Sequence, residues 1–148
     1  MSHHSGAVLV VEDHREVREM VRAILEQEGY PTTGASNGVQ ALDALHREGD
    51  KPRLIVLDLM MPGMGGIELI VQLSNDEALA SIPLLVMTAH PDICDKNRSQ
   101  LVFVPVVSKP LDCDELLAAV RKSCGAPEPA PRHSWIGTLA GLFGKLDQ

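Results

Sequence analysis

The stretch Arg53-Leu-Ile-Val-Leu-Asp58-Leu-Met-Met-Pro-Gly-Met-Gly-Gly66 places an acid at the end of an apolar run, with a turn-rich segment after it. A run that stays apolar at successive positions is typical of a strand buried on both faces of a sheet. A carboxylate at the carboxyl end of such a strand lies at the edge where open α/β sheets bind their ligands. Asp58 is therefore the first candidate functional residue.

The rest of the chain alternates between strand-like and helix-like segments. Apolar runs predict strands at residues 7–11, 32–35, 54–57, 84–87 and 103–107. Helices are predicted near residues 17–25, 39–45, 67–74, 91–100 and 113–124, of which the fourth is short and polar. This order predicts an α/β fold, a doubly wound five-stranded parallel sheet with helices on both faces. Because Pro105 has no N–H to donate, the fifth strand is predicted to lie at an edge.

Local signals mark the ends of several helices. Asn37 is a predicted N-cap, and Asp112 with Glu115 forms a predicted capping box. Leu111 can pack on Leu116 as a hydrophobic staple. The predicted ends are Gly29, Gly49-Asp50 and Gly125. The predicted apolar faces of the first two helices are Val17, Met20, Val21, Ile24 and Leu25, and then Val39, Leu42 and Leu45.

Length and composition indicate one domain with a short appendage. The 148 residues divide into a flexible N-terminus at 1–6, compatible with a tag remnant, a domain at 7–124, a Pro-rich linker at 125–132 and an amphipathic tail at 133–148. The net charge of −7 argues against direct nucleic-acid binding. Three cysteines without a C-x-x-C pair favour reduced thiols and a cytoplasmic location, and no apolar run approaches the ~20 residues of a membrane helix.

The tail carries a second candidate function. Its large apolar residues are spaced to share one face of a helix, namely Trp135, Ile136, Leu139, Leu142, Phe143 and Leu146. The tail is expected either to dock on its own domain, to stay disordered, or to bind a groove of a partner protein. Membrane-surface binding is disfavoured because the polar face lacks a Lys/Arg cluster.

Reactive side chains follow four of the predicted strands. Glu12-Asp13, Asp58, Thr88 and Lys109 stand at the ends of the first, third, fourth and fifth strands. In a parallel sheet these ends share one edge, so three acids, a hydroxyl and an ammonium group converge. Mg²⁺ would relieve the repulsion between the acids, and Asp58 could act as the nucleophile of aspartyl-phosphate chemistry. Taken singly, each residue has a plainer interpretation as a helix cap, a turn former, a strand-end hydroxyl or a surface charge.

As a set these segments resemble the receiver domain of bacterial two-component response regulators. The resemblance rests on Val10-Val-Glu-Asp-His14, Val56-Leu-Asp-Leu-Met-Met-Pro-Gly63, Val86-Met-Thr-Ala89 and Ser108-Lys-Pro110, and covers about residues 6–124. It implies the flavodoxin-like strand order 2-1-3-4-5, of which a receiver is a known example. It also implies that Asp58 is the phosphoacceptor.

The resemblance further implies a Mg²⁺ site and the roles of the other residues. Asp13, Asp58 and the Met60 carbonyl would bind Mg²⁺, with Glu12 assisting through water. Thr88 would meet the phosphoryl group and Lys109 would pair with it. The Lys109–Pro110 bond would be cis, as is common in this family.

A receiver takes its phosphoryl group from a histidine kinase or a phosphotransfer protein and catalyses only its own phosphorylation and dephosphorylation. The expected output is contact with another protein. This contact would use the predicted helix at 91–100, the strand at 103–107 and the helix at 113–124, or the 133–147 tail. Other enzyme classes are disfavoured, because the D-x-D and G-x-G-x-x-G patterns are missing after the first strand.

Several features depart from the family. Val106 stands where an aromatic residue usually switches, the usual Gly-Ala before the fifth strand is missing, and the predicted helix at 91–100 is short and polar. Gly65 also replaces a common helix-capping Asp, although glycine is a tolerable cap. Val106 and the poor helix at 91–100 support an alternative, a receiver-like binding module whose output does not depend on phosphorylation.

Overall fold

The structure is a computed structural model that describes residues 6–47 and 51–128. Predictions that fall on residues 1–5, on Gly49-Asp50 and on 129–148 lie outside the described residues. The elements in chain order are β1 Val8–Val11, α1 Arg15–Gln27, β2 Thr32–Ala35, α2 Gly38–His46, β3 Leu54–Asp58, α3 Gly66–Ser74, β4 Leu84–Thr88, α4 Asp92–Lys96, β5 Val106–Ser108 and α5 Cys113–Cys124.

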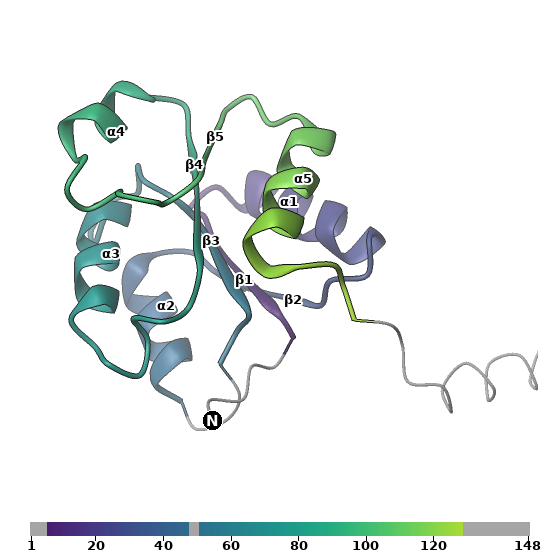
Figure 1. Ribbon diagram of the computed structural model, residues 1–148, viewed down its shortest axis with the longest axis horizontal. Coiled ribbons are helices and arrows are strands. Elements are labelled where there is room, and N and C mark those ends of the chain that lie inside the picture. The colour runs from purple at the N-terminus through teal and green to yellow at the C-terminus, as the bar shows by residue number, and fades with distance from the viewer. Residues whose placement is uncertain (1–5, 48–50, 129–148) are drawn as a thin grey trace, which may run out of the picture.

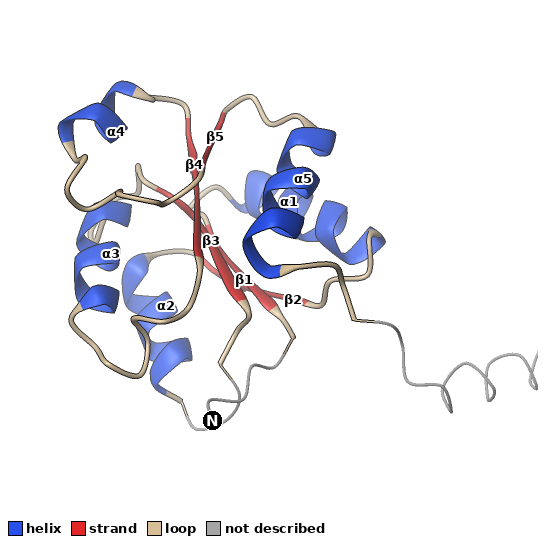
Figure 2. Ribbon diagram, viewed as in Figure 1, coloured by secondary structure: helices blue, strands red, loops and turns tan. Residues whose placement is uncertain are grey.

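The strands form one parallel sheet in the order β2-β1-β3-β4-β5 (Figures 1 and 2). This arrangement confirms the predicted doubly wound α/β fold and its strand order. β5 lies at an edge, as predicted. Helices α1 and α5 cover one face of the sheet, and α2 and α3 cover the other (Figure 1).

The central strands are apolar at every position before their last residues, Asp58 and Thr88, because both of their faces are covered. In β1, Val8 and Val10 pack under α1 and α5, whereas Leu9 and Val11 pack under α2 and α3. The strand β3 alternates in the same way between the two cores. The period of two along each strand therefore divides one apolar run between two cores.

The fifth strand differs from the prediction of 103–107, since β5 begins only at Val106. The residues before it form a turn, in which the Val104 N–H donates to the Leu101 carbonyl at 3.0 Å. Phe103 has a positive φ of 64°, a conformation incompatible with a strand, and its side chain is 99% exposed. Pro105 precedes the strand and contributes only its carbonyl, which accepts from the Val86 N–H.

Two other residues do not lie where the predicted helix faces put them. Val39 is 54% exposed, because the buried face of α2 follows Ala41 and Leu45, and Val39 lies about 200° around the helix from Ala41. Met20 is 44% exposed beside a buried stripe at Val21 and Leu25. The other predicted apolar residues of these helices are buried or pack against the core.

The predicted N-caps Asn37 and Asp112 are confirmed. The Asn37 side chain accepts from the Gln40 N–H, and the Asp112 side chain accepts from the Glu115 N–H. Leu111 packs against the same core as the buried Leu116. Gly29 and Gly125 follow α1 and α5 with positive φ, where a glycine costs little. Helix α4 is short and has no buried residue, as its polar sequence predicted.

The chain after α5 is held by two residues far away in the sequence. Arg53 donates from Nη2 to the carbonyls of Cys124 and Ala126, and its guanidinium lies 5.6 Å from the centroid of the Tyr30 ring. The Tyr30 hydroxyl donates to the Gly125 carbonyl at 2.7 Å. These contacts of Arg53 and Tyr30 with residues 124–126, called the latch below, fix the position at which the chain leaves the domain.

None of the helices in the described ranges is long and apolar enough to cross a membrane.

Candidate functional site

The structure brings the strand-end residues to one edge of the sheet. Glu12 follows β1, Asp58 ends β3, Thr88 ends β4, and Lys109 follows β5. Parallel pairing aligns these ends, since Asp58 is opposite Met87 and Thr88 is opposite Ser108. The predicted convergence of acids, hydroxyl and lysine is therefore present in the fold.

Lys109 joins two buried carboxylates. Its Nζ donates to Glu12 Oε1 at 2.9 Å and to Asp58 Oδ2 at 3.3 Å. Glu12 and Asp58 are both buried, whereas the Lys109 side chain is partly exposed. One ammonium group thus faces two acids, so the ionised cluster carries one excess negative charge before Asp13 is counted.

Burial and the neighbouring charges change the pKa of Glu12 and of Lys109. Burial, together with a hydrogen bond to Asp58, raises the pKa of Glu12 to about 7, although Lys109 opposes the rise. Burial alone would lower the pKa of Lys109, but its hydrogen bond to Glu12 and its attraction to Asp58 and Glu12 outweigh burial and raise it. Near neutral pH, Glu12 therefore holds a proton for part of the time while Lys109 stays charged.

The Asp58 carboxylate is held from two sides. Its Oδ1 accepts from the Met60 N–H at 3.1 Å, and Oδ2 faces Lys109. Helix α3 begins directly against its backbone, since a Cβ atom on Gly66 would lie 2.6 Å from the Asp58 carbonyl oxygen. A glycine at the start of α3 therefore lets that helix approach Asp58 closely.

Thr88 lies buried at the end of β4. Its Oγ1 accepts from the His90 N–H at 2.9 Å, and its carbonyl accepts from the Lys109 N–H at 2.8 Å. The second bond connects the loop that carries Lys109 to β4. Thr88 thus belongs to the same edge as Asp58, and its hydroxyl is engaged with its own loop.

The acids of β1 suit a hard cation. Within the described residues, Glu12 Oε2 and Asp13 Oδ1 are buried atoms without a hydrogen-bond partner. Ligand atoms of Glu12, Asp13 and His14 lie within 4.8 Å of one another. Two unpartnered carboxylate oxygens are the donors that Mg²⁺ prefers. This set differs from the predicted ligands by containing the exposed His14 and omitting Asp58, whose Oδ2 faces Lys109.

Some members of the site were not predicted. The Arg18 guanidinium donates to the Glu12 carbonyl at 2.8 Å and supports the loop that carries the acids. The Met60 N–H and the close approach of Gly66 were also missed. A sequence signal existed for both, because an acid often accepts from the N–H two residues later and Gly65-Gly66 opens a helix.

Comparison with known proteins assigns the domain to a family. Residues 8–121 match the response regulator receiver domain family. Sporulation initiation phosphotransferase F of Bacillus subtilis is 34% identical over 78% of this chain and 90% of its own length. The chain spans only about half the length of several other curated relatives. The chain belongs to the response regulator receiver domain family of two-component signalling, as the sequence motifs predicted.

Solved structures of receiver domains have the same fold as this chain. The receiver domain of a signal transduction histidine kinase from Syntrophus aciditrophicus has a TM-score of 0.70 and 32% identity, covering 80% of this chain and 89% of its own. The receiver domain of the sensor histidine kinase PA1611 from Pseudomonas aeruginosa has a TM-score of 0.73 over 82% of this chain and 98% of its own, at 23% identity, which supports the fold alone. That structure has a magnesium ion coordinated in its active-site cleft.

Proposed function

We propose that Asp58 accepts a phosphoryl group from a histidine kinase or a phosphotransfer protein. The observation that carries this proposal is the position of Asp58, buried at the end of the central strand β3 with Lys109 Nζ 3.3 Å from Oδ2. In the transfer, a carboxylate oxygen of Asp58 bonds to phosphorus as the nitrogen–phosphorus bond of the donor breaks. The product is an acyl phosphate on Asp58.

Lys109 would neutralise part of the phosphoryl charge. It already lies between two carboxylates, so its exchange of Asp58 Oδ2 for a phosphoryl oxygen needs only a short movement. Thr88 would donate its hydroxyl hydrogen to a phosphoryl oxygen, since its Oγ1 acts as the acceptor in the hydrogen bond from the His90 N–H. Positioning and charge neutralisation are most of what phosphoryl transfer requires from a protein.

Mg²⁺ would be held by Asp13, Asp58 and the Met60 carbonyl, with Glu12 assisting through water. Support for this site comes from the two unpartnered oxygens of Glu12 and Asp13. Bound Mg²⁺ supplies positive charge to the developing phosphoryl oxygens.

We further propose that the protein signals from the cytoplasm as a stand-alone receiver, through contact with another protein. The alternative is a binding module whose output is independent of phosphorylation. The alternative is supported by Val106 in place of the usual aromatic residue and by an α4 of only five residues. Both functions allow phosphorylation of Asp58. They differ in whether phosphorylation changes the conformation of the surface formed by α4, β5 and α5.

Titration with beryllofluoride and Mg²⁺, followed by NMR, tests the proposal. The complex mimics a phosphorylated aspartate, and Asp58→Asn is the control. Phosphoacceptor function with switching predicts shifts in the wild type alone that spread from Asp58 to residues 90–109. Shifts confined to the neighbours of Asp58 support the binding-module alternative. A wild-type protein that does not respond refutes the phosphoacceptor role.

A further inference from the structure

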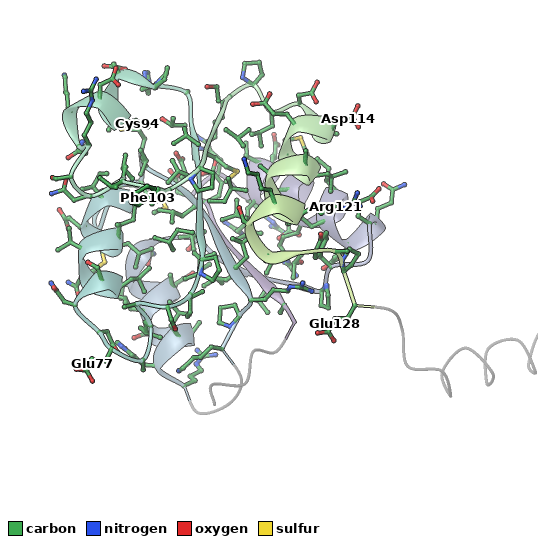
Figure 3. The ribbon with its side chains drawn as sticks, in the orientation of Figure 1. Glu77, Cys94, Phe103, Asp114, Arg121 and Glu128 are labelled. Atoms are coloured by element: carbon green, nitrogen blue, oxygen red, sulfur yellow. The ribbon has the colours of Figure 1, made fainter. Side chains whose placement is uncertain are left out.

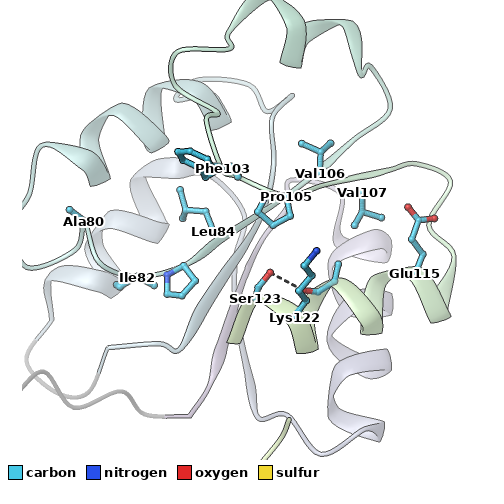
Figure 4. A pocket seen from close by; sticks show the side chains of 13 residues that line it. Ala80, Ile82, Leu84, Phe103, Pro105, Val106, Val107, Glu115, Lys122 and Ser123 are labelled. Atoms are coloured by element: carbon cyan, nitrogen blue, oxygen red, sulfur yellow. Dashed lines mark hydrogen bonds between the residues drawn. The ribbon is translucent and has the colours of Figure 1, made fainter. Parts of the chain in front are cut away.

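A groove lined by apolar residues lies away from Asp58. It has a volume of about 800 Å³ and runs along the edge strand β5 and the face of α5 (Figure 4). Its apolar lining includes Ile82, Leu84, Phe103, Pro105, Val106 and Ala119. The groove is distinct from the acidic edge, since neither Asp58 nor Lys109 lines it.

The groove presents apolar side chains to water. Phe103 is 99% exposed and Val106 is 37% exposed. Phe103 also has a positive φ, so the backbone holds this large side chain outward at some conformational cost. Exposed apolar side chains beside a groove are typical of a surface that binds another apolar surface.

The described chain ends near the Pro83 end of this groove. Glu128 lines a smaller cavity of about 340 Å³ together with Ser81 and Pro83, and Pro83 also lines the apolar groove. The latch formed by Arg53 and Tyr30 holds residues 124–126 at this end of the molecule. Glu128 can be seen in Figure 3 where the described chain leaves the domain.

The sequence beyond Glu128 has the reach and the chemistry to fill the groove. Seven residue steps separate Glu128 from Trp135, and a Pro-rich segment extends ~3.1 Å per residue, or about 22 Å. The groove extends from Pro83 to the level of Val107. Val107 pairs with Met87, so the groove follows the chain from Pro83 to Met87, which is about 13 Å at ~3.3 Å per residue. A helix over residues 135–143 would be about 13 Å long.

We propose that the tail segment 133–147 docks in the apolar groove of its own chain. The apolar face of this segment, beginning at Trp135, would cover Phe103, Val106 and Ala119. Docking of this kind hides the β5–α5 face from other proteins, so the tail acts as an intramolecular competitor of any partner that uses this face. The proposal does not depend on phosphorylation of Asp58.

Trp135 provides the test, because it is the only tryptophan in the chain. In the full-length wild type, its fluorescence should be blue-shifted and protected from acrylamide. Val106→Lys puts a charge in the groove, and should raise the undocked fraction roughly tenfold, with a red shift and faster quenching. Val39→Lys is the matched control, since Val39 is also an exposed valine but lies on α2 outside the groove, and it should change nothing.

A second variant guards against a folding defect. Phe103→Gly removes a fully exposed side chain and relieves its positive φ, so it should fold normally and also expose Trp135. Three results would overturn the proposal. These are a Trp135 that is solvent-exposed in the wild type, protection that both groove variants leave intact, and protection that rises with protein concentration and so comes from a second copy.

Discussion

Gly66→Ala places a methyl group where the structure has no room for one. The added Cβ would lie 2.6 Å from the Asp58 carbonyl oxygen and 2.6 Å from Leu59 Cα. Both are backbone atoms, so the clash is relieved only if α3 or the Asp58 loop moves. The neighbouring Gly65→Ala is a matched control, because its Cβ would lie 3.7 Å from the nearest atom, the Leu59 carbonyl oxygen.

The expected magnitudes separate the two variants. Overpacking of this kind costs about 1–3 kcal/mol, and the gain in helix propensity from glycine to alanine returns at most about 1 kcal/mol. Gly66→Ala should therefore lower the free energy of unfolding by about 1–2 kcal/mol. Gly65→Ala changes only the N-cap of α3 and should cost about 0.5 kcal/mol.

Urea denaturation measures the stability difference, and Mg²⁺ titration measures the site. Because the clash displaces the backbone of Asp58, Gly66→Ala should also weaken Mg²⁺ binding, whereas Gly65→Ala should not. If the two variants match each other in both stability and Mg²⁺ affinity, the close approach of α3 does not position Asp58 and the reasoning is refuted.

Three further predictions concern the pH dependence, a cap and the latch. In chelator, the contribution of Glu12 to wild-type stability should fall by about 1–2 kcal/mol as pH rises from 4.5 to 7, because native Glu12 keeps a proton that the unfolded chain releases. Glu12→Gln should flatten this slope in urea titrations at several pH values; an unchanged slope would assign it to other groups. Asn37→Ala should lower the free energy of unfolding, measured by urea denaturation, by about 1 kcal/mol. Asn37→Ser should lower it much less, since serine keeps a capping oxygen. Arg53→Met should speed hydrogen exchange in the last turn of α5, seen by NMR, while the first turn of α5 keeps its protection.

The sequence predicted the parts of the fold that depend on local patterns. Apolar runs located β1 and β3, because strands buried on both faces leave no polar positions. Asn37 and Asp112 located helix starts, since their side chains accept backbone N–H groups nearby in the chain. The strand ends then placed the acids, the hydroxyl and Lys109 at one edge.

Other features depend on contacts that the sequence does not display. The apolar run 103–107 resembles a strand, but Phe103 at φ 64° and the turn from Leu101 to Val104 delay β5 to Val106. Similarly, the pKa of Glu12 rises through burial and through a partner 46 positions away, Asp58. The residue types predicted which groups come together at the sheet edge. The structure is needed to show how deeply each group is buried and which partner it contacts.

The strand β3 has Asp58 at one end and the latch residue Arg53 just before the other. Five residues at ~3.3 Å make this separation about 17 Å. At that distance a unit charge added at Asp58 interacts with a charge near Glu128 by only roughly 0.2–1 kcal/mol, depending on the effective dielectric constant. A coupling of the usual 1–3 kcal/mol between Asp58 and the departing chain therefore has to be mechanical, transmitted by repacking along β4, β5 and α5 rather than by the electric field of the phosphoryl group.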